Sequence, residues 1–520
     1  MATHSESSDE TKMQSYLKVP PLLWIMLVAV AGRAWLLFST PYMPGVNGAY
    51  YLIQARAILE RGVLGIPDLP LTFYLQAGLS WLLARAGGMV MTDAIMVAVK
   101  TCDAVLPVLV AWPVFVLVRR WAIARGQGDA VPLAAAALAC LSMPWFIVVG
   151  ELQKNSLAMV WFALLVTNLH GWLLQPTRRR ALALVAVLLL LGLTHIGVLG
   201  ASVVVTAATA LAFLLRQSQG VRWKRILPMM GVGVLILLAT SALVVWKFDP
   251  SRIQRLGSAF TDPFQFSWEG RQQPGQGRMW LNPDGLLPFL GFAIAIAPSL
   301  IVVWYRRIQL EAADFAVVTG CALTVLMMTG PWFSPDKSMR FYLIAFLPAI
   351  WGVSFGLTHM DRNAWRQTVL GVIVLTGLGG SAWILIPGGK PILEEATMVE
   401  LENLAWHIQD RDHTLVVADH GVEWWSAWFL HTHIAQPQAL SPNVWGRYKT
   451  VLFLKVKTGV VSLSGRGGSR PSRISGAPPG HPMPLPGIAE DSELIYDGAT
   501  LRLEKFHHAT QFASARVSPP

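Results

Sequence analysis

Charged residues are scarce in this sequence of 520 residues. Asp, Glu, Lys and Arg make up 14% of the chain, and hydrophobic residues make up 54%, whereas about a quarter of the residues in a soluble domain are charged. The composition therefore excludes an ordinary soluble domain and indicates a protein that is solvated by lipid. Apolar stretches of about 18 residues or more, which can cross a bilayer core of roughly 30 Å, recur between Leu22 and Ile386.

Cysteines and targeting signals are also few. The three cysteines all lie in apolar stretches, at Cys102, Cys140 and Cys321, which excludes a disulfide framework or a zinc cluster and predicts packing residues. The polar N-terminal segment is not followed by a small-residue cleavage site, so we expect the first apolar helix to be retained. The net charge of +11 is not accompanied by a base-stacking module or a basic helix with interleaved aromatics, so we expect no nucleic-acid partner.

Eleven stretches are predicted to cross the membrane: 22–39, 94–118, 131–149, 156–174, 181–196, 198–215, 226–247, 286–305, 314–332, 341–357 and 368–387. Between alternate spans lie basic clusters, which include Arg119 and Arg120, Arg178 to Arg180, Arg222 to Arg225, Arg306 and Arg307, and Arg362 and Arg366. By the positive-inside rule these segments and the N-terminal tail (1–21) face the cytoplasm. The segment 71–87 is short and carries Gln76 and Arg85, so we assign it as an interfacial, re-entrant helix.

The chain changes character after the membrane part (22–387). Apolar runs shorten to strand length at 414–419 and 450–456, with a helical stretch at 395–409, which predicts a small α/β domain. The segment 464–487 is rich in Gly, Ser, Pro and Arg and predicts a flexible loop. The sequence therefore predicts a polytopic α-helical membrane protein with juxtamembrane helices in its first external loop (40–93) and an extracytoplasmic α/β domain at 388–520.

Polar and ionisable residues near the ends of the predicted spans gather on one side of the membrane. Such residues are costly in lipid and are candidates for function when they face the bundle interior. The extracytoplasmic ends hold Asn47, Asp68, Lys100, Asp103, Glu151, Lys154, His195, Asp336, Lys337 and Arg340. Lys or Arg can bind a lipid phosphate and stabilise it as a leaving group, while a carboxylate removes a proton from an acceptor hydroxyl or amine. The pattern suits sugar transfer from a lipid phosphate.

Two motifs carry a family resemblance. The first is PGVNGAYYLIQARAILERGVLGIPDLPLTFYLQAGLSWLL at 44–83, with an amphipathic helix expected at about 48–61 and Gly62 as its cap, and the second is GELQKN at 150–155. The sequence resembles the membrane-embedded GT-C glycosyltransferases, a group that includes the aminoarabinose transferases and the protein O-mannosyltransferases. The resemblance implies a polyprenyl-phosphate-linked sugar donor, a lipid, glycan or protein acceptor, and an inverting single displacement at the extracytoplasmic face.

The resemblance also implies roles for individual residues. Glu151 occupies the position of an acidic motif, but Asn47 stands where the family's first loop has its catalytic Asp. Because an amide cannot act as a carboxylate base, either Asp68 or Glu151 takes the base role, or Asn47 only positions the acceptor, or the chain is a degenerate member. Candidates for binding the donor and its phosphate are Lys154, Arg340, Lys337, His195, Tyr50 and Tyr51. A divalent cation stays open, since two suitably placed carboxylates could hold one.

Several of these residues also have a structural interpretation. Asn47 could cap the helix that follows it, and Asp68 could stabilise a proline-flanked turn. Glu151 and Lys154 could pair with each other at their spacing of three residues. A similar pairing is the preferred interpretation of Lys100 and Asp103, which would make them structural residues.

The remaining candidates have alternatives too. His195 could be a packing residue, and Lys337 and Arg340 could reach towards lipid headgroups. The segment HGVEWWSAWFLHTH at 420–433 lacks a zinc-binding spacing, so it predicts an aromatic helix that packs on the membrane or the core, with acceptor binding as the alternative. A lipid or solute transporter would also have many helices, but it predicts inverted repeats and broken helices, which the sequence does not show.

Overall fold

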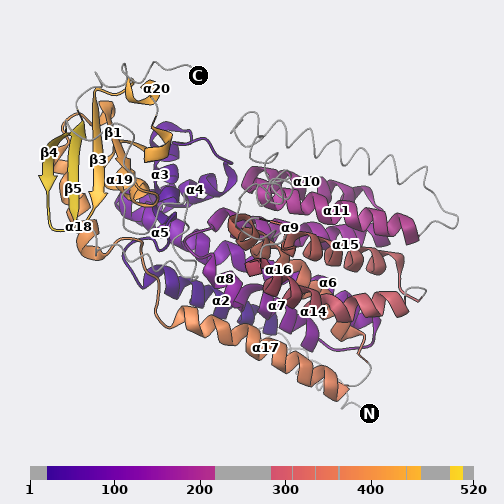
Figure 1. Ribbon diagram of the computed structural model, residues 1–520. Coiled ribbons are helices and arrows are strands. Elements are labelled where there is room, and N and C mark those ends of the chain that lie inside the picture. Colours follow the sequence, from indigo (N-terminus) through magenta and orange to yellow (C-terminus); the bar gives the residue numbers. More distant parts are fainter. Residues whose placement is uncertain are drawn as a thin grey trace, which may run out of the picture.

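A computed structural model of the chain describes residues 20–216, 283–306, 309–333, 335–360, 363–440, 442–457 and 492–506. A bundle of long helices forms one part and a sheet with short helices forms the other (Figure 1). The bundle contains α2 (Pro21–Phe38), α5 (Met91–Val105), η1 (Leu106–Val110), α6 (Ala111–Ala124), α7 (Ala130–Leu141), α8 (Met143–Ile147), α9 (Gln153–Leu174), α10 (Arg178–Thr194), α11 (Ile196–Arg216), α14 (Pro283–Tyr305), α15 (Ala312–Thr329), α16 (Pro335–Thr358) and α17 (Asn363–Leu385).

Nine helical segments in the described ranges are long and apolar enough to cross a membrane, and they correspond to nine of the eleven predicted spans. One of them runs without a break through α5, η1 and α6 over 34 residues; Pro107 lies in its 3₁₀ turn, where the missing backbone N–H disfavours an α-helix. The predicted span 181–196 lies in α10, which has 17 residues and is not among the nine. The predicted span 226–247 lies outside the described residues.

Apolar side chains cover the outside of the bundle. On α17, Leu375 and Trp383 are 75% and 81% exposed, and on α14 Trp304 is 69% exposed. Contiguous apolar surface of this extent is rare on proteins that are surrounded by water. Together with the nine membrane-length segments, it makes the chain an integral membrane protein. The three cysteines are buried and unpaired, in agreement with their prediction as packing residues.

Residues in or beside the segments that are predicted to face the cytoplasm contact one another at one end of the bundle. His170 at the end of α9 contacts Asp314 at the start of α15, with 2.7 Å between Nε2 and Oδ1. Arg125, which follows α6, lies 2.6 Å from Nε2 of His359, which follows α16. The sheet lies beyond the opposite end of the bundle (Figure 1). The alternation that the basic clusters predict is therefore consistent with the packing of these helices.

The first loop contains two helices that lie between the bundle and the sheet (Figure 1). α3 spans Gly48–Arg61 and α4 spans Leu71–Gly87, which confirms the predicted helical ranges 48–61 and 71–87. Gly62 ends α3 with a φ of 74° and donates its N–H to Ile58 O at 2.8 Å, as expected of a left-handed cap. Most of α3 is buried, including Tyr51, Leu52 and Ala55 of its predicted apolar face.

The C-terminal part is a five-stranded mixed sheet with the order β2-β1-β3-β5-β4. Its elements are α18 (Glu395–Leu404), η2 (Ala405–His407), η3 (Arg411–His413), β1 (Thr414–Ala418), α19 (Val422–Leu430), β2 (His433–Ala435), η4 (Pro437–Ala439), α20 (Pro442–Trp445), β3 (Thr450–Val456), β4 (Ser492–Asp497) and β5 (Leu501–Phe506). β1 pairs in parallel with β2 and β3, whereas β5 pairs antiparallel with β3 and β4. The prediction of an α/β domain is confirmed, and the predicted loop 464–487 lies outside the described residues.

Glu400 on α18 holds the turn between β4 and β5. Its carboxylate accepts hydrogen bonds from Thr500 N at 2.8 Å, Thr500 Oγ1 at 2.7 Å and Leu501 N at 3.0 Å. Burial raises the pKa of Glu400, but the hydrogen bonds from Thr500 and Leu501 outweigh it and leave the pKa below its ordinary value. The ionised carboxylate therefore stabilises this part of the domain.

The first loop and the C-terminal domain share one apolar core. A single cluster of buried side chains joins Leu37 of α2, Leu52 of α3 and Phe73 of α4 to Trp425 of α19 and Leu503 of β5. Burial of apolar area is the main source of stability in such a cluster. The sheet domain is thus packed onto the first loop, and α3 is covered from both sides.

Candidate functional site

A buried ion pair anchors the turn that precedes α9. Arg33 of α2 and Asp103 of α5 are both fully buried, with 2.7 Å between the guanidinium and Oδ1. Arg33 also donates to Trp145 O at 2.8 Å, and the second carboxylate oxygen of Asp103 accepts from Gly150 N at 2.7 Å. Three elements of the bundle therefore fix the backbone just before Glu151. Sequence reasoning missed Arg33, which lies inside an apolar span.

Two glycines let the first loop lie directly against this turn. Gly45 and Gly150 have φ angles of +86° and +77°, which residues other than glycine rarely adopt. A Cβ on Gly45 would lie 2.8 Å from Glu151 Oε2, and a Cβ on Gly150 would lie 2.9 Å from Pro44 Cγ. Because neither glycine has a side chain, the residues around Asn47 and those around Glu151 come into contact.

Lys100 holds the start of the same loop. Its ammonium donates to Thr40 O at 2.7 Å and to Pro41 O at 3.0 Å. The expected pairing of Lys100 with Asp103 is therefore wrong, because Asp103 binds Arg33 and Lys100 binds backbone carbonyls. The preference for a structural role of both residues agrees with these contacts.

Asn47 binds Glu151. The backbone N–H of Asn47 donates to Glu151 Oε2 at 2.9 Å, and its side-chain amide donates to Oε1. In the described structure, the Asn47 side chain makes no capping hydrogen bond to α3, so the capping interpretation is wrong. A carboxylate attracts an amide donor more strongly than a neutral partner does, and both oxygens of Glu151 are oriented by one residue.

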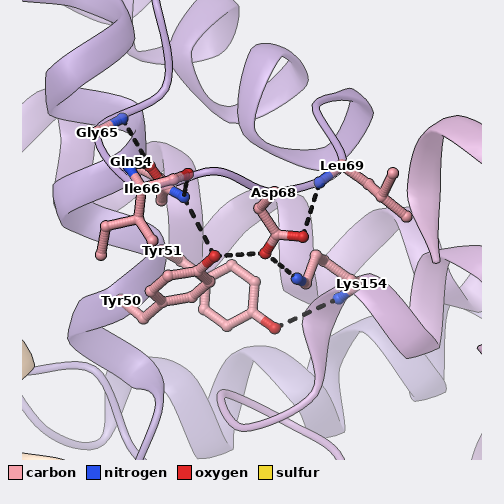
Figure 2. A network of polar contacts seen from close by, with 8 residues as sticks. All are labelled: Tyr50, Tyr51, Gln54, Gly65, Ile66, Asp68, Leu69 and Lys154. Atoms are coloured by element: carbon pink, nitrogen blue, oxygen red, sulfur yellow. Dashed lines mark hydrogen bonds and ion pairs between the residues drawn. The ribbon is translucent and has the colours of Figure 1, made fainter. Parts of the chain in front are cut away.

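Asp68 is the centre of a second network (Figure 2). Its side chain is 1% exposed, and its Oδ2 accepts from the Tyr50 hydroxyl and pairs with the Lys154 ammonium. Oδ1 accepts from Leu69 N at 2.6 Å, which is a contact with the next residue and not with the residue two positions on, as in an Asx turn. The structure shows Lys154 paired with Asp68 and not, as the alternative predicted, with Glu151.

Gln54 fixes the chain that carries Asp68. Its amide oxygen accepts from Gly65 N at 2.9 Å and Ile66 N at 3.1 Å, and its amide nitrogen donates to Ile66 O at 2.8 Å and to the Tyr50 hydroxyl at 3.1 Å (Figure 2). Sequence reasoning missed this residue. The available signal was a glutamine on the buried face of an amphipathic helix, where a polar side chain needs partners.

The two tyrosines keep their protons. Burial, followed by the nearby charge of Asp68, raises the pKa of Tyr50 far above its ordinary value, and burial also raises the pKa of Tyr51. Tyr50 is therefore a hydrogen-bond donor to Asp68. Tyr51 accepts from the backbone N–H of Lys154 over 3.5 Å, a long contact that contributes little by itself.

Aromatic rings surround the Lys154 ammonium. Nζ lies 5.5 Å from the ring centre of Tyr50 and 5.4 Å from that of Phe73, within the range of cation–π attraction. The Lys154 side chain is 12% exposed. Lys154 is therefore held in one position, and a small part of its side chain is accessible from outside the network.

Solved membrane glycosyltransferases share this architecture. The oligosaccharyltransferase of Archaeoglobus fulgidus, crystallised with zinc and sulfate, matches with a TM-score of 0.55 and 13% identity over 84% of this chain and 68% of that one. ArnT from Cupriavidus metallidurans, bound to undecaprenyl phosphate, matches with a TM-score of 0.52 and 11% identity over 93% and 97%. The chain has the GT-C fold. No protein-family model matches the chain, and neither does any curated protein sequence.

Within this GT-C fold, the predicted site residues fall into separate groups. Contacts join Asn47 to Glu151, and join Tyr50, Tyr51 and Asp68 to Lys154. Arg340 is exposed near the start of α16, and the side chain of Lys337, one turn earlier, lies outside the described part. His195 lies between α10 and α11, where its Nδ1 accepts from Val198 N at 3.2 Å.

The donor set does not favour a divalent cation. In the described ranges, no group of three or more His, Cys, Asp or Glu side chains is arranged to hold a metal ion. The two candidate carboxylates also have separate partners, since Asp68 pairs with Lys154 and Glu151 accepts from Asn47. A divalent ion would need oxygen ligands that converge on one point.

Proposed function

We propose that the chain is a glycosyltransferase that moves a monosaccharide from a polyprenyl-phosphate donor to an acceptor at the extracytoplasmic face of the membrane. The observation that carries this proposal is the fixed Lys154 ammonium three residues from the partly exposed Glu151 carboxylate, beside the C-terminal domain. A cation for the donor phosphate and a carboxylate for the acceptor proton are what this reaction requires. The GT-C fold and the undecaprenyl phosphate bound by ArnT support the donor class.

The residues divide between the two substrates. Lys154 and Arg340 bind the donor phosphate, with Lys337 and His195 as further candidates on this side. Glu151 takes the proton of the acceptor hydroxyl or amine while the acceptor atom attacks the anomeric carbon. The bond from that carbon to the phosphate oxygen breaks, the electron pair leaves with the phosphate, and the configuration inverts.

The network partners of these residues have positioning roles in the proposal. Asp68 is buried, so we assign it to holding Lys154 and Tyr50 and not to proton removal. Asn47 orients Glu151 through two hydrogen bonds and so retains a function without being a base. This division supports an active enzyme in spite of the amide at position 47.

The orientation in the membrane follows from charge. In the described part of the chain, Arg125 lies in a turn at the end of the bundle remote from the sheet, and basic segments between spans usually face the cytoplasm. The N-terminus is then cytoplasmic, and the C-terminal domain and the proposed site lie outside. Membrane lipids and the lipid-linked donor are therefore the partners expected at the site.

The test uses purified full-length protein in liposomes that contain polyprenyl-phosphate-linked sugars. We expect Glu151→Gln to lower the transfer rate by about 10² to 10⁴ while donor binding persists, and Lys154→Gln to weaken donor binding. Glu311→Gln is the matched control, because Glu311 is an exposed acid at the start of α15 on the opposite end. Wild-type protein that binds none of the donors would contradict the proposal.

A further variant separates an active enzyme from a degenerate one. Asn47→Asp restores the residue that the resemblance implies at this position, directly beside Glu151. If wild type transfers sugar, we expect Asn47→Asp to slow it, because two carboxylates in contact repel each other. Transfer by Asn47→Asp alone would show that the natural chain is a degenerate member.

A further inference from the structure

The C-terminal domain holds a histidine–carboxylate pair that the proposed function does not use. His420 Nδ1 lies 2.9 Å from Glu423 Oε1, and Gln436 donates to the same oxygen at 2.7 Å. The Glu423 side chain is buried, whereas the His420 side chain is 52% exposed. A carboxylate that binds one ring nitrogen fixes the orientation of the imidazole and directs the other nitrogen, Nε2, away from it.

The backbone beside His420 packs directly on the first loop. Gly421 has a φ of +95°, and a Cβ on it would lie 2.8 Å from Val46 Cγ1. Val46 is the neighbour of Asn47, which binds Glu151. One turn further along, the Trp424 ring lies 5.0 Å from the ring of Tyr50 and 6.3 Å from that of His420. His420 therefore lies next to both networks of the candidate site, the Asn47–Glu151 contact and the network around Asp68.

Charges from three elements act on the His420 ring. The hydrogen bond to Glu423 raises its pKa, burial opposes this, and the charges of Glu423 and Glu151 raise it further while Arg340 of α16 lowers it. The net effect raises the pKa of His420 above its ordinary value and so increases its protonated fraction at a given pH. The charges of the proposed acceptor-side carboxylate, Glu151, and of the proposed phosphate-side cation, Arg340, therefore both act on this ring.

Building on the proposed function, we propose that His420, supplied by the C-terminal domain and oriented by Glu423, donates a hydrogen bond from Nε2 to the departing phosphate of the donor. As the bond between the anomeric carbon and the phosphate oxygen breaks, negative charge grows on that oxygen. The imidazolium and Arg340 stabilise this charge, and the acceptor proton goes to Glu151. His420 keeps its own proton, so the reaction remains balanced.

The same domain offers a matched control. His413 and Asp410 form a pair with the same spacing of three residues, with 2.8 Å between Nδ1 and Oδ1. Their side chains are 67% and 41% exposed, and they precede β1, whereas His420 follows it. A change at His413 therefore removes an equivalent pair that lies away from the first loop.

The experiment measures binding of undecaprenyl phosphate without a sugar to full-length protein in nanodiscs of neutral phospholipid. We expect His420→Gln and His420→Ala each to weaken binding about tenfold at pH 6.5, the effect of losing a charge-assisted hydrogen bond. His413→Gln should bind as wild type does. Between pH 6 and pH 9, the ratio of the His420→Gln to the wild-type dissociation constant should fall towards one, because His420 loses its proton.

Glu423→Gln adds a second readout. Removing the carboxylate removes the largest influence that raises the pKa of His420, so the pH at which the ratio falls should move to lower values. Equal binding by wild type and both His420 variants would overturn this inference and leave the proposed function standing. Equal loss in His413→Gln would also overturn it. Wild type that binds no undecaprenyl phosphate would remove the proposed function and the inference together.

Discussion

Replacing Arg33 tests the anchor beneath the site. Arg33→Met leaves the fully buried Asp103 carboxylate with the Gly150 N–H, at 2.7 Å, as its remaining hydrogen-bond donor in the described structure, and breaking a buried ion pair in this way costs about 3–5 kcal/mol. The double variant Arg33→Met/Asp103→Leu removes both charges. Apolar replacements of buried pairs are often neutral or stabilising, so we expect the double variant to be more stable than the single one by at least about 2 kcal/mol.

The assay is the free energy of unfolding of purified protein in mixed micelles, from denaturant titration. The matched control is Arg119→Met, because Arg119 and Asp129 form an ion pair at 2.9 Å with both side chains about half exposed, and such pairs contribute no more than about 1 kcal/mol. A loss in Arg33→Met as small as that in Arg119→Met would refute the reasoning. So would a double variant that is no more stable than Arg33→Met.

Two further predictions concern the C-terminal domain. Because the pKa of Glu400 is lowered in the folded protein, its contribution is present near neutral pH and is lost as the pH falls below about 4. The protection factor for hydrogen exchange at Thr500, which is the intrinsic rate divided by the observed rate, should fall there in wild type and should be low at both pH values in Glu400→Gln. Gly421→Ala should loosen the contact with Val46 and speed proteolysis of the segment 386–394, which connects α17 to α18. Gly88→Ala should not have this effect, because Gly88 is also at positive φ but a Cβ on it would meet no other atom.

Local patterns were enough to predict most elements. The apolar residues at helical spacing in the first loop, followed by Gly62, predicted the bounds of α3, and the short apolar segment before Gly88 predicted α4. Both depend on neighbours within one or two helical turns. The strands at 414–418 and 450–456 followed from the same kind of signal.

Contacts between distant residues were not predictable in this way. Asn47 and Glu151 are 104 positions apart. A short polar side chain before a helix is normally interpreted as a cap, because the free N–H groups of the helix are the partners that are visible in the sequence. Arg33 and its partner are 70 positions apart. An arginine in an apolar span signals a buried partner, but the sequence does not show which residue that partner is. His420 was not selected because the aromatic residues that follow it favoured a packing helix, and these residues do form the helix α19.

The core shared by the first loop and the sheet has a consequence for biosynthesis. The cluster that covers α3 includes Leu503 of β5, which the ribosome makes long after it has made α3. Part of the apolar surface of the loop therefore stays uncovered until β5 has been synthesised. A nascent chain can form its first helices early, but it completes the core around α3 only after the C-terminal domain has folded.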